Sequence, residues 1–189
     1  MRHFSNMKTI AMLVVAFASL KAIPKHAPEP VPKNDREKIL TVASSQVGII
    51  EKTGKNDGEV EKYIASVGLN PKGGYPYCAA FNYWVGREAL EKSPYPKSAW
   101  SPDQVKNGQR VTKNTTIKGA ETFGIYFRSK GRVAHTGLVE SFDGSSFTTI
   151  EANTNANAAV GSAGDRDGQG VYRKRRHWRT VHNVRDWIE

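Results

Sequence analysis

Hydrophobic residues recur at helical spacing over the first half of the chain. Three segments show this pattern, residues 34–48, 56–68 and 78–91, with apolar positions three and four residues apart. The first two open on an asparagine, Asn34 and Asn56, that is followed three residues later by a glutamate, and both close on a glycine. These are helix start and stop signals, so the pattern predicts three helices.

From residue 124 onward the hydrophobic pattern changes to a period of two. It predicts strands over residues 124–127, 133–142, 147–153 and 170–177. Asp143 and Gly144 form a turn signal between the second and third of these strands. Helices followed by an antiparallel sheet indicate an α+β fold, in which N-terminal helices pack on the sheet.

The N-terminal residues carry a targeting pattern. Arg2 and Lys8 precede an uncharged run over residues 10–20, which is shorter than the roughly 20 apolar residues that a bilayer span needs. The pattern is typical of a signal peptide rather than a membrane anchor, and small residues allow cleavage after Ala18 or after Ala22. We therefore expect an exported protein, periplasmic or extracellular, with no stable membrane span.

These patterns divide the chain into three parts. We predict a signal peptide over residues 1–22, a proline-rich spacer over 23–33 and one folded catalytic domain over 34–189. Within the domain, residues 93–120 are polar and rich in turn signals, and the glycine-rich residues 153–170 predict a mobile loop.

The formal net charge of +10 favours a polyanionic partner. Much of the positive charge lies in the run YRKRRHWR, residues 172–179. Because export separates the protein from cytoplasmic nucleic acid, we expect anionic wall polymers or a membrane surface to bind this basic C-terminal strand and expect no nucleic-acid partner. The chain has no C-x-x-C or H-E-x-x-H motif, so no metal or other cofactor is predicted.

The single cysteine, Cys78, stands where the third helical pattern begins. Unpaired backbone N–H groups and the helix dipole at such a position favour the thiolate, which is the nucleophilic form. A lone cysteine is also commonly a small buried hydrophobic residue. A catalytic role therefore requires a base elsewhere in the chain.

His135 is the candidate base. It lies in the second predicted strand beside Gly137, whose missing side chain would leave room for a ligand. The Asp143-Gly144 turn places the partner of His135 near residue 152 on the next strand, so either Glu151 or Asn153 could accept a hydrogen bond from the imidazole. Nucleophile, base and orienting residue in this order predict cysteine acyl-transfer chemistry.

The segment YPYCAAFNYWV resembles the W-C-A-A-F signature of CHAP domains, the cysteine, histidine-dependent amidohydrolases and peptidases, with Tyr77 in place of the tryptophan. AHTGLVES and TIEANTN resemble the G-H-T-G-I-V-E and I-E-G-N-T-N blocks of that family, and VGIIEKTGKNDGEVEKYIASVGL resembles its N-terminal helical region. The resemblance covers residues 34–176.

The resemblance implies a papain-like α+β fold related to that of NlpC-type enzymes. It carries the catalytic group over to Cys78, His135 and Glu151, with Asn153 as an auxiliary fourth member. The candidates for contact with substrate are the aromatic residues near the thiol, Tyr75, Tyr77 and Trp84. The backbone N–H of Cys78, together with Tyr75 or Tyr77, is expected to stabilise the oxyanion.

The resemblance also implies the substrate. We expect a cysteine hydrolase that cleaves an amide bond of peptidoglycan, either as an N-acetylmuramoyl-L-alanine amidase or as a peptide endopeptidase. A second hypothesis is a catalytically silent wall-binding or inhibitory module with the same fold.

Overall fold

The computed structural model describes residues 34–188. The predicted signal peptide and spacer lie outside the described residues. Within the described part, no helix has both the length and the apolar character that crossing a membrane would require.

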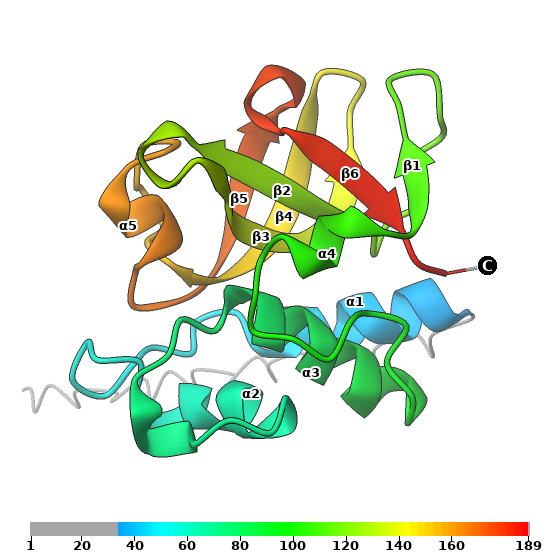
Figure 1. The fold of residues 1–189 in the computed structure, drawn as a ribbon. Coiled ribbons are helices and arrows are strands. Elements are labelled where there is room, and N and C mark those ends of the chain that lie inside the picture. Colours follow the sequence, from blue (N-terminus) through cyan, green and yellow to red (C-terminus); the bar gives the residue numbers. More distant parts are fainter. Residues whose placement is uncertain (1–33, 189) are drawn as a thin grey trace, which may run out of the picture. The chain divides into compact units, whose positions relative to one another are not determined.

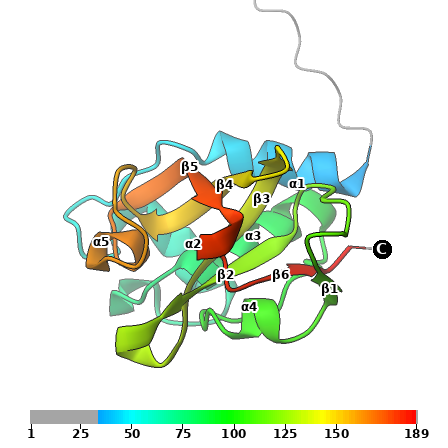
Figure 2. The ribbon, with the colours of Figure 1, turned by 90° about the horizontal axis from the view of Figure 1, so that it is seen from above.

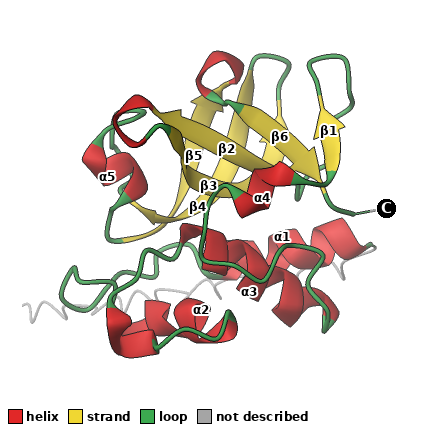
Figure 3. Ribbon diagram, in the orientation of Figure 1, coloured by secondary structure: helices red, strands yellow, loops and turns green. Residues whose placement is uncertain are grey.

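The described residues form one antiparallel sheet with helices packed against it (Figures 1 and 3). The helices are α1 (Asp35–Ser45), α2 (Glu61–Ser66), α3 (Cys78–Leu90), α4 (Asp103–Lys106) and α5 (Ala163–Arg166). The strands are β1 (Gln109–Val111), β2 (Thr122–Phe127), β3 (Arg132–Phe142), β4 (Ser146–Thr154), β5 (Gly170–His177) and β6 (Asn183–Asp186). The sheet order is β1-β6-β2-β3-β4-β5. The predicted α+β fold, with N-terminal helices on an antiparallel sheet, is therefore confirmed.

Asn34 caps α1 as predicted, whereas Asn56 lies one residue before Asp57, the N-cap of the second helical segment, and is not its cap. The side chain of Asn34 accepts a 3.0 Å hydrogen bond from the Glu37 backbone N–H, which satisfies one of the unpaired donors at the start of α1. The second predicted helix is a short 3₁₀ turn, Gly58–Val60, that continues into α2. Strand β3 packs on α3, and the two elements lie close together in the view from above (Figure 2).

The predicted hairpin joins β3 and β4. Oδ1 of Asp143 accepts hydrogen bonds from the backbone N–H groups of Ser145 and Ser146, at 2.9 and 2.8 Å. Gly144 follows with φ +95°, a conformation that glycine adopts without steric cost. The turn sets a register in which Leu138 lies opposite Ile150, and this register fixes which residues of the two strands meet.

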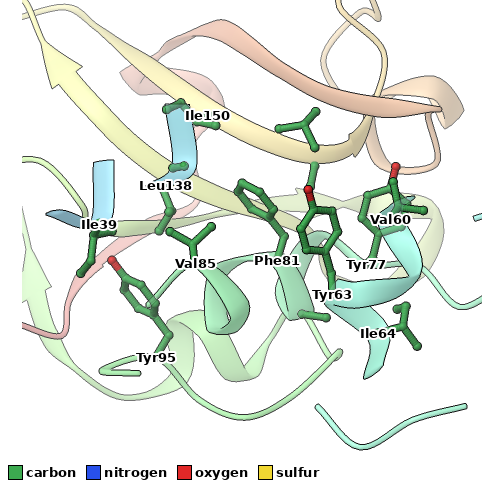
Figure 4. Close-up of a cluster of buried hydrophobic side chains, with 14 of the residues drawn as sticks. Ile39, Val60, Tyr63, Ile64, Tyr77, Phe81, Val85, Tyr95, Leu138 and Ile150 are labelled. Carbon is green, nitrogen blue, oxygen red and sulfur yellow. The ribbon is translucent and has the colours of Figure 1, made fainter. Parts of the chain in front are cut away.

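Both faces of the sheet are buried. Leu138 and the neighbouring Val139 point to opposite faces, as successive strand residues do, and each belongs to a separate core. The core toward α1, α2 and α3 contains Phe81 and Tyr63 (Figure 4). The other core contains Phe123, Phe147 and Val184. Since α3 packs against the first core, its N-terminus is held in place beside β3.

Candidate active site

Cys78 is the first residue of α3 and is only 2% exposed. The helix starts here because the Phe81 N–H donates to the Tyr77 carbonyl at 2.8 Å, which closes the first turn. The thiol Sγ lies 3.4 Å from the hydroxyl oxygen of Ser101, a buried residue on the loop between α3 and α4. The predicted position of the thiol at a helix N-terminus is therefore what the structure shows.

His135 lies on β3 and is fully buried. Its Nε2 is 2.7 Å from Oε2 of Glu151 on β4. Its Nδ1 makes no hydrogen bond to a group of the described residues that meets the usual distance limits. Because Nε2 is hydrogen-bonded to Glu151, Nδ1 is the ring nitrogen that is available to exchange a proton with the Cys78 thiol.

Gly137 has a different role from the one predicted. A side chain at this position would come within 2.8 Å of the Ile150 carbonyl and 2.9 Å of Cγ of Glu151. The glycine therefore leaves room for the Glu151 side chain rather than for a ligand, and it lets that carboxylate reach His135.

The thiol and the imidazole shift one another's pKa. Burial raises the pKa of the Cys78 thiol, but the adjacent polar and positively charged imidazole of His135, with the Ser101 hydroxyl, more than offsets this and leaves the pKa lowered. Burial lowers the pKa of His135, but its interactions with the Cys78 thiol and with the Glu151 carboxylate raise it to about 9. The two groups therefore favour a thiolate–imidazolium pair near neutral pH.

The pH dependence of Cys78 alkylation measures the pKa of the thiol and therefore tests for this ion pair. We expect iodoacetamide to react with Cys78 with a midpoint below pH 8.5, the ordinary thiol pKa, because the thiolate is populated at lower pH. His135→Ala removes the cation and is expected to move the midpoint back toward 8.5 or above. A wild-type midpoint at or above 8.5 would contradict the ion pair.

Glu151 is buried, and both oxygens of its carboxylate make hydrogen bonds. The Thr149 hydroxyl donates to its Oε1 at 2.5 Å, Nε of Arg176 donates to the same oxygen at 2.8 Å, and Nη2 of Arg176 donates to Oε2. Burial raises the pKa of this carboxyl, but Arg176 and His135 hold it well below its usual range. The carboxylate therefore remains charged beside the imidazole.

A second buried carboxylate extends the network. Arg176 of β5 has no exposed surface and also donates to Asp165, at 3.0 Å from Nη1 and 2.6 Å from Nη2. Nζ of Lys174 donates to Asp165 at 2.8 Å. The segment 153–170, predicted to be a mobile loop, is thus anchored through Asp165 and contains α5. A chain of contacts runs from Cys78 through His135, Glu151 and Arg176 to this loop.

Arg176 and Asp165 are site residues that the sequence analysis missed. The signal was available, because period-two alternation along 170–177 puts Lys174 and Arg176 on the inner face and Arg173 and Arg175 on the outer one. Charged residues are seldom fully buried, which favoured the exposed interpretation.

Most cations of the basic run, which is predicted to bind wall polymers, are paired with carboxylates of the protein itself. Besides the buried pairs of Lys174 and Arg176, Arg173 pairs with Glu140 at 2.9 Å and Arg175 pairs with Asp143. Its own acidic partners therefore neutralise most of the charge of β5.

Asn153 makes no hydrogen bond to His135 in the structure. It has φ +59° at an irregularity in the pairing of β4 with β5, which turns it away from the regular alternation. Its amide Nδ2 donates to the Arg166 carbonyl at 2.7 Å, and its buried Oδ1 has no hydrogen-bond partner among the described residues. Of the two residues that bracket the predicted register, Glu151 contacts the imidazole.

Of the three aromatic candidates, Tyr77 lies in the core and Trp84 is partly buried and packs against it. Tyr77 has no exposed surface, and its hydroxyl donates to Oε1 of Glu51 at 3.0 Å, so it is available neither to substrate nor to an oxyanion (Figure 4). The ring of Trp84 packs edge-on against Tyr63 of α2 at 5.1 Å. Tyr75 is 42% exposed and precedes Cys78 closely, so it remains a candidate for contact with substrate.

Residues 70–153 match the family model of the CHAP domain. The matched segment includes Cys78, His135, Glu151 and Asn153, and it confirms the family resemblance identified from the sequence motifs. No curated protein sequence matches the chain.

Proposed function

Starting from this CHAP domain match, we propose that the protein is an exported cysteine hydrolase that cleaves an amide bond of peptidoglycan. CHAP domains are typically amidases or peptidases, and the match indicates peptidoglycan-hydrolase-type activity in general. The observation that carries the proposal is the buried group Cys78, His135 and Glu151, in which a thiol with a lowered pKa adjoins an imidazole with a raised one.

The proposed reaction has two steps. The Cys78 thiolate attacks the amide carbonyl carbon, the C–N bond breaks, and the His135 imidazolium gives its proton to the departing amine. Water then attacks the thioester, giving its proton to the neutral imidazole, and the C–S bond breaks to release the carboxylate. Glu151 keeps the imidazole oriented and stabilises its charged form throughout.

The start of α3 supports stabilisation of the oxyanion. The first N–H groups of a helix have no intrahelical partner, and Cys78 contributes one of them at the reacting centre. The exposed Tyr75 is the remaining aromatic candidate for the second donor.

A catalytically silent wall-binding module with the same fold is the alternative. Such a module needs neither a lowered thiol pKa nor a buried carboxylate on the imidazole. The presence of both in this site favours the hydrolase.

Digestion of defined peptidoglycan tests the proposal. We expect the full-length protein to release fragments whose masses show the addition of one water at an amide bond. New lactyl carboxyl ends on muramic acid indicate an amidase, whereas new peptide termini indicate an endopeptidase. Cys78→Ala serves as the control for contaminating hydrolases, and intact peptidoglycan after prolonged incubation with the wild-type protein would overturn the proposal.

A further inference from the structure

An arginine and an exposed tryptophan lie together beside the candidate active site. Trp100 directly precedes Ser101, whose hydroxyl is 3.4 Å from the Cys78 sulfur. Arg132 is the first residue of β3, the strand that carries His135. Arg132 and His135 are three residues apart, and three residues of extended strand span about 10 Å, so their Cα atoms lie no farther apart than about that distance.

The two side chains are in direct contact. Cζ of Arg132 lies 3.8 Å from the centroid of the Trp100 ring, a cation–π arrangement. Trp100 remains 50% exposed, an unusual fraction for a tryptophan, and its backbone N–H donates to the Ser98 hydroxyl at 3.0 Å. The ring thus contacts the guanidinium of Arg132 while part of it remains open to solvent.

Several N–H groups of the Arg132 guanidinium have no hydrogen-bond acceptor among the described residues. Nη1 donates to the Val133 carbonyl at 2.8 Å, and within residues 34–188 no carboxylate forms an ion pair with Arg132. The nearest acidic residue along the Trp100 segment, Asp103, instead accepts a hydrogen bond from Ser98 at 2.6 Å. This situation contrasts with Arg173 and Arg176, whose guanidinium groups are occupied by carboxylates.

A guanidinium held over an aromatic ring, with N–H groups that have no partner among the described residues, is suited to a planar carboxylate. The stem peptide of peptidoglycan carries free carboxylates within a few residues of its amide bonds. We propose that Arg132, held by Trp100, binds such a carboxylate and thereby positions the scissile amide at Cys78. This inference rests on the proposed function and adds a preference for stem peptides with a free rather than an amidated carboxyl group.

Binding to an inactive protein tests the subsite apart from turnover. The probes are two synthetic N-acetylmuramoyl-L-Ala-γ-D-Glu-L-Lys peptides with amidated C-termini, identical except that the D-Glu α-carboxyl is free in one and a carboxamide in the other. Full-length Cys78→Ala protein is expected to bind the free acid about tenfold more tightly, the effect of one charge-assisted hydrogen-bonded pair.

Further substitutions in the Cys78→Ala protein test whether Arg132 causes the preference for the free-acid probe. Arg132→Gln is expected to bind both probes equally, and Arg132→Lys is expected to recover only part of the preference because ammonium cannot bond bidentately. Arg128→Gln, which removes an exposed charge on the turn before β3, is the matched control and is expected to keep the preference. Equal binding of the two probes by the Cys78→Ala protein, or a full preference in Arg132→Gln, would overturn the subsite.

Different experimental results would refute the carboxylate subsite and the proposed hydrolase activity. Carboxylate preference in binding without hydrolysis by the wild-type protein would refute the hydrolase and support the subsite. Hydrolysis of both amidated and free peptidoglycan at equal kcat/KM would refute the subsite and leave the hydrolase standing.

Discussion

Cys78→Ala is expected to lower the rate of peptidoglycan hydrolysis by at least about a thousandfold, since it removes the only thiol of the chain and leaves His135 without a group to activate. The side chain is small and buried at a helix start, so the variant is expected to fold. Release of soluble fragments measures the activity, and circular dichroism with thermal unfolding verifies the fold.

Ser101→Ala is the matched control for this substitution. It removes the hydroxyl that lies 3.4 Å from the sulfur but leaves the thiol and imidazole in place. We expect a loss of about tenfold or less, because one hydrogen bond to the thiolate is lost. Hydrolysis that survived in folded Cys78→Ala protein would eliminate the cysteine mechanism, whereas unimpaired binding of peptidoglycan by that variant is compatible with it.

Arg176→Met is expected to lower the free energy of unfolding by about 3–5 kcal/mol, the usual cost of removing one partner from a buried ion pair. Methionine has a similar apolar stem, but it leaves the carboxylates of Glu151 and Asp165 facing one another without a cation between them. Arg175→Met is the matched control. Its side chain is 66% exposed and its pair with Asp143 lies at the surface, so we expect a change below about 1 kcal/mol. Denaturant unfolding of the three proteins measures both effects.

The pH dependence of this difference identifies its cause. In the folded protein the pKa values of Glu151 and Asp165 are lowered, so their contribution to stability is present above their unfolded pKa values of about 4 and is lost as the pH falls. Without Arg176 the carboxyls take up protons more readily in the folded state. The gap between wild type and Arg176→Met is therefore expected to narrow as the pH falls below about 4. A gap that stayed constant with pH would indicate a packing defect instead.

Hydrophobic periodicity was enough to predict most of the fold, because the longer helices and strands bury one or both faces and therefore carry a regular apolar pattern. The short strands β1, at the edge of the sheet, and β6, between β1 and β2, were missed, since they contain few residues and carry charged side chains such as Arg110 and Arg185. Strand pairing at the edge of the sheet, rather than local sequence pattern, determines their conformation.

In the candidate site, turn chemistry was enough to bring Glu151 to His135, because the Asp143 turn fixes the hairpin register. It was not enough to exclude Asn153 from that contact. The positive φ of Asn153 arises from a pairing irregularity that an ordinary asparagine in a strand pattern does not reveal. Tyr77 was misplaced for a related reason, since its buried hydroxyl depends on Glu51, which is distant in sequence.

The site residues come from two parts of the fold, a helix and a later hairpin, and this determines when the thiol of a newly made chain becomes reactive. Cys78 comes from α3, whereas His135 and Glu151 come from the later β3–β4 hairpin. Until the hairpin docks on the helix, the thiol has an ordinary pKa and only a few per cent of it is thiolate at pH 7. The nascent polypeptide therefore carries no strong nucleophile, and reactivity appears only on completion of tertiary structure. No propeptide or separate inhibitor is needed to keep the unfolded chain inert.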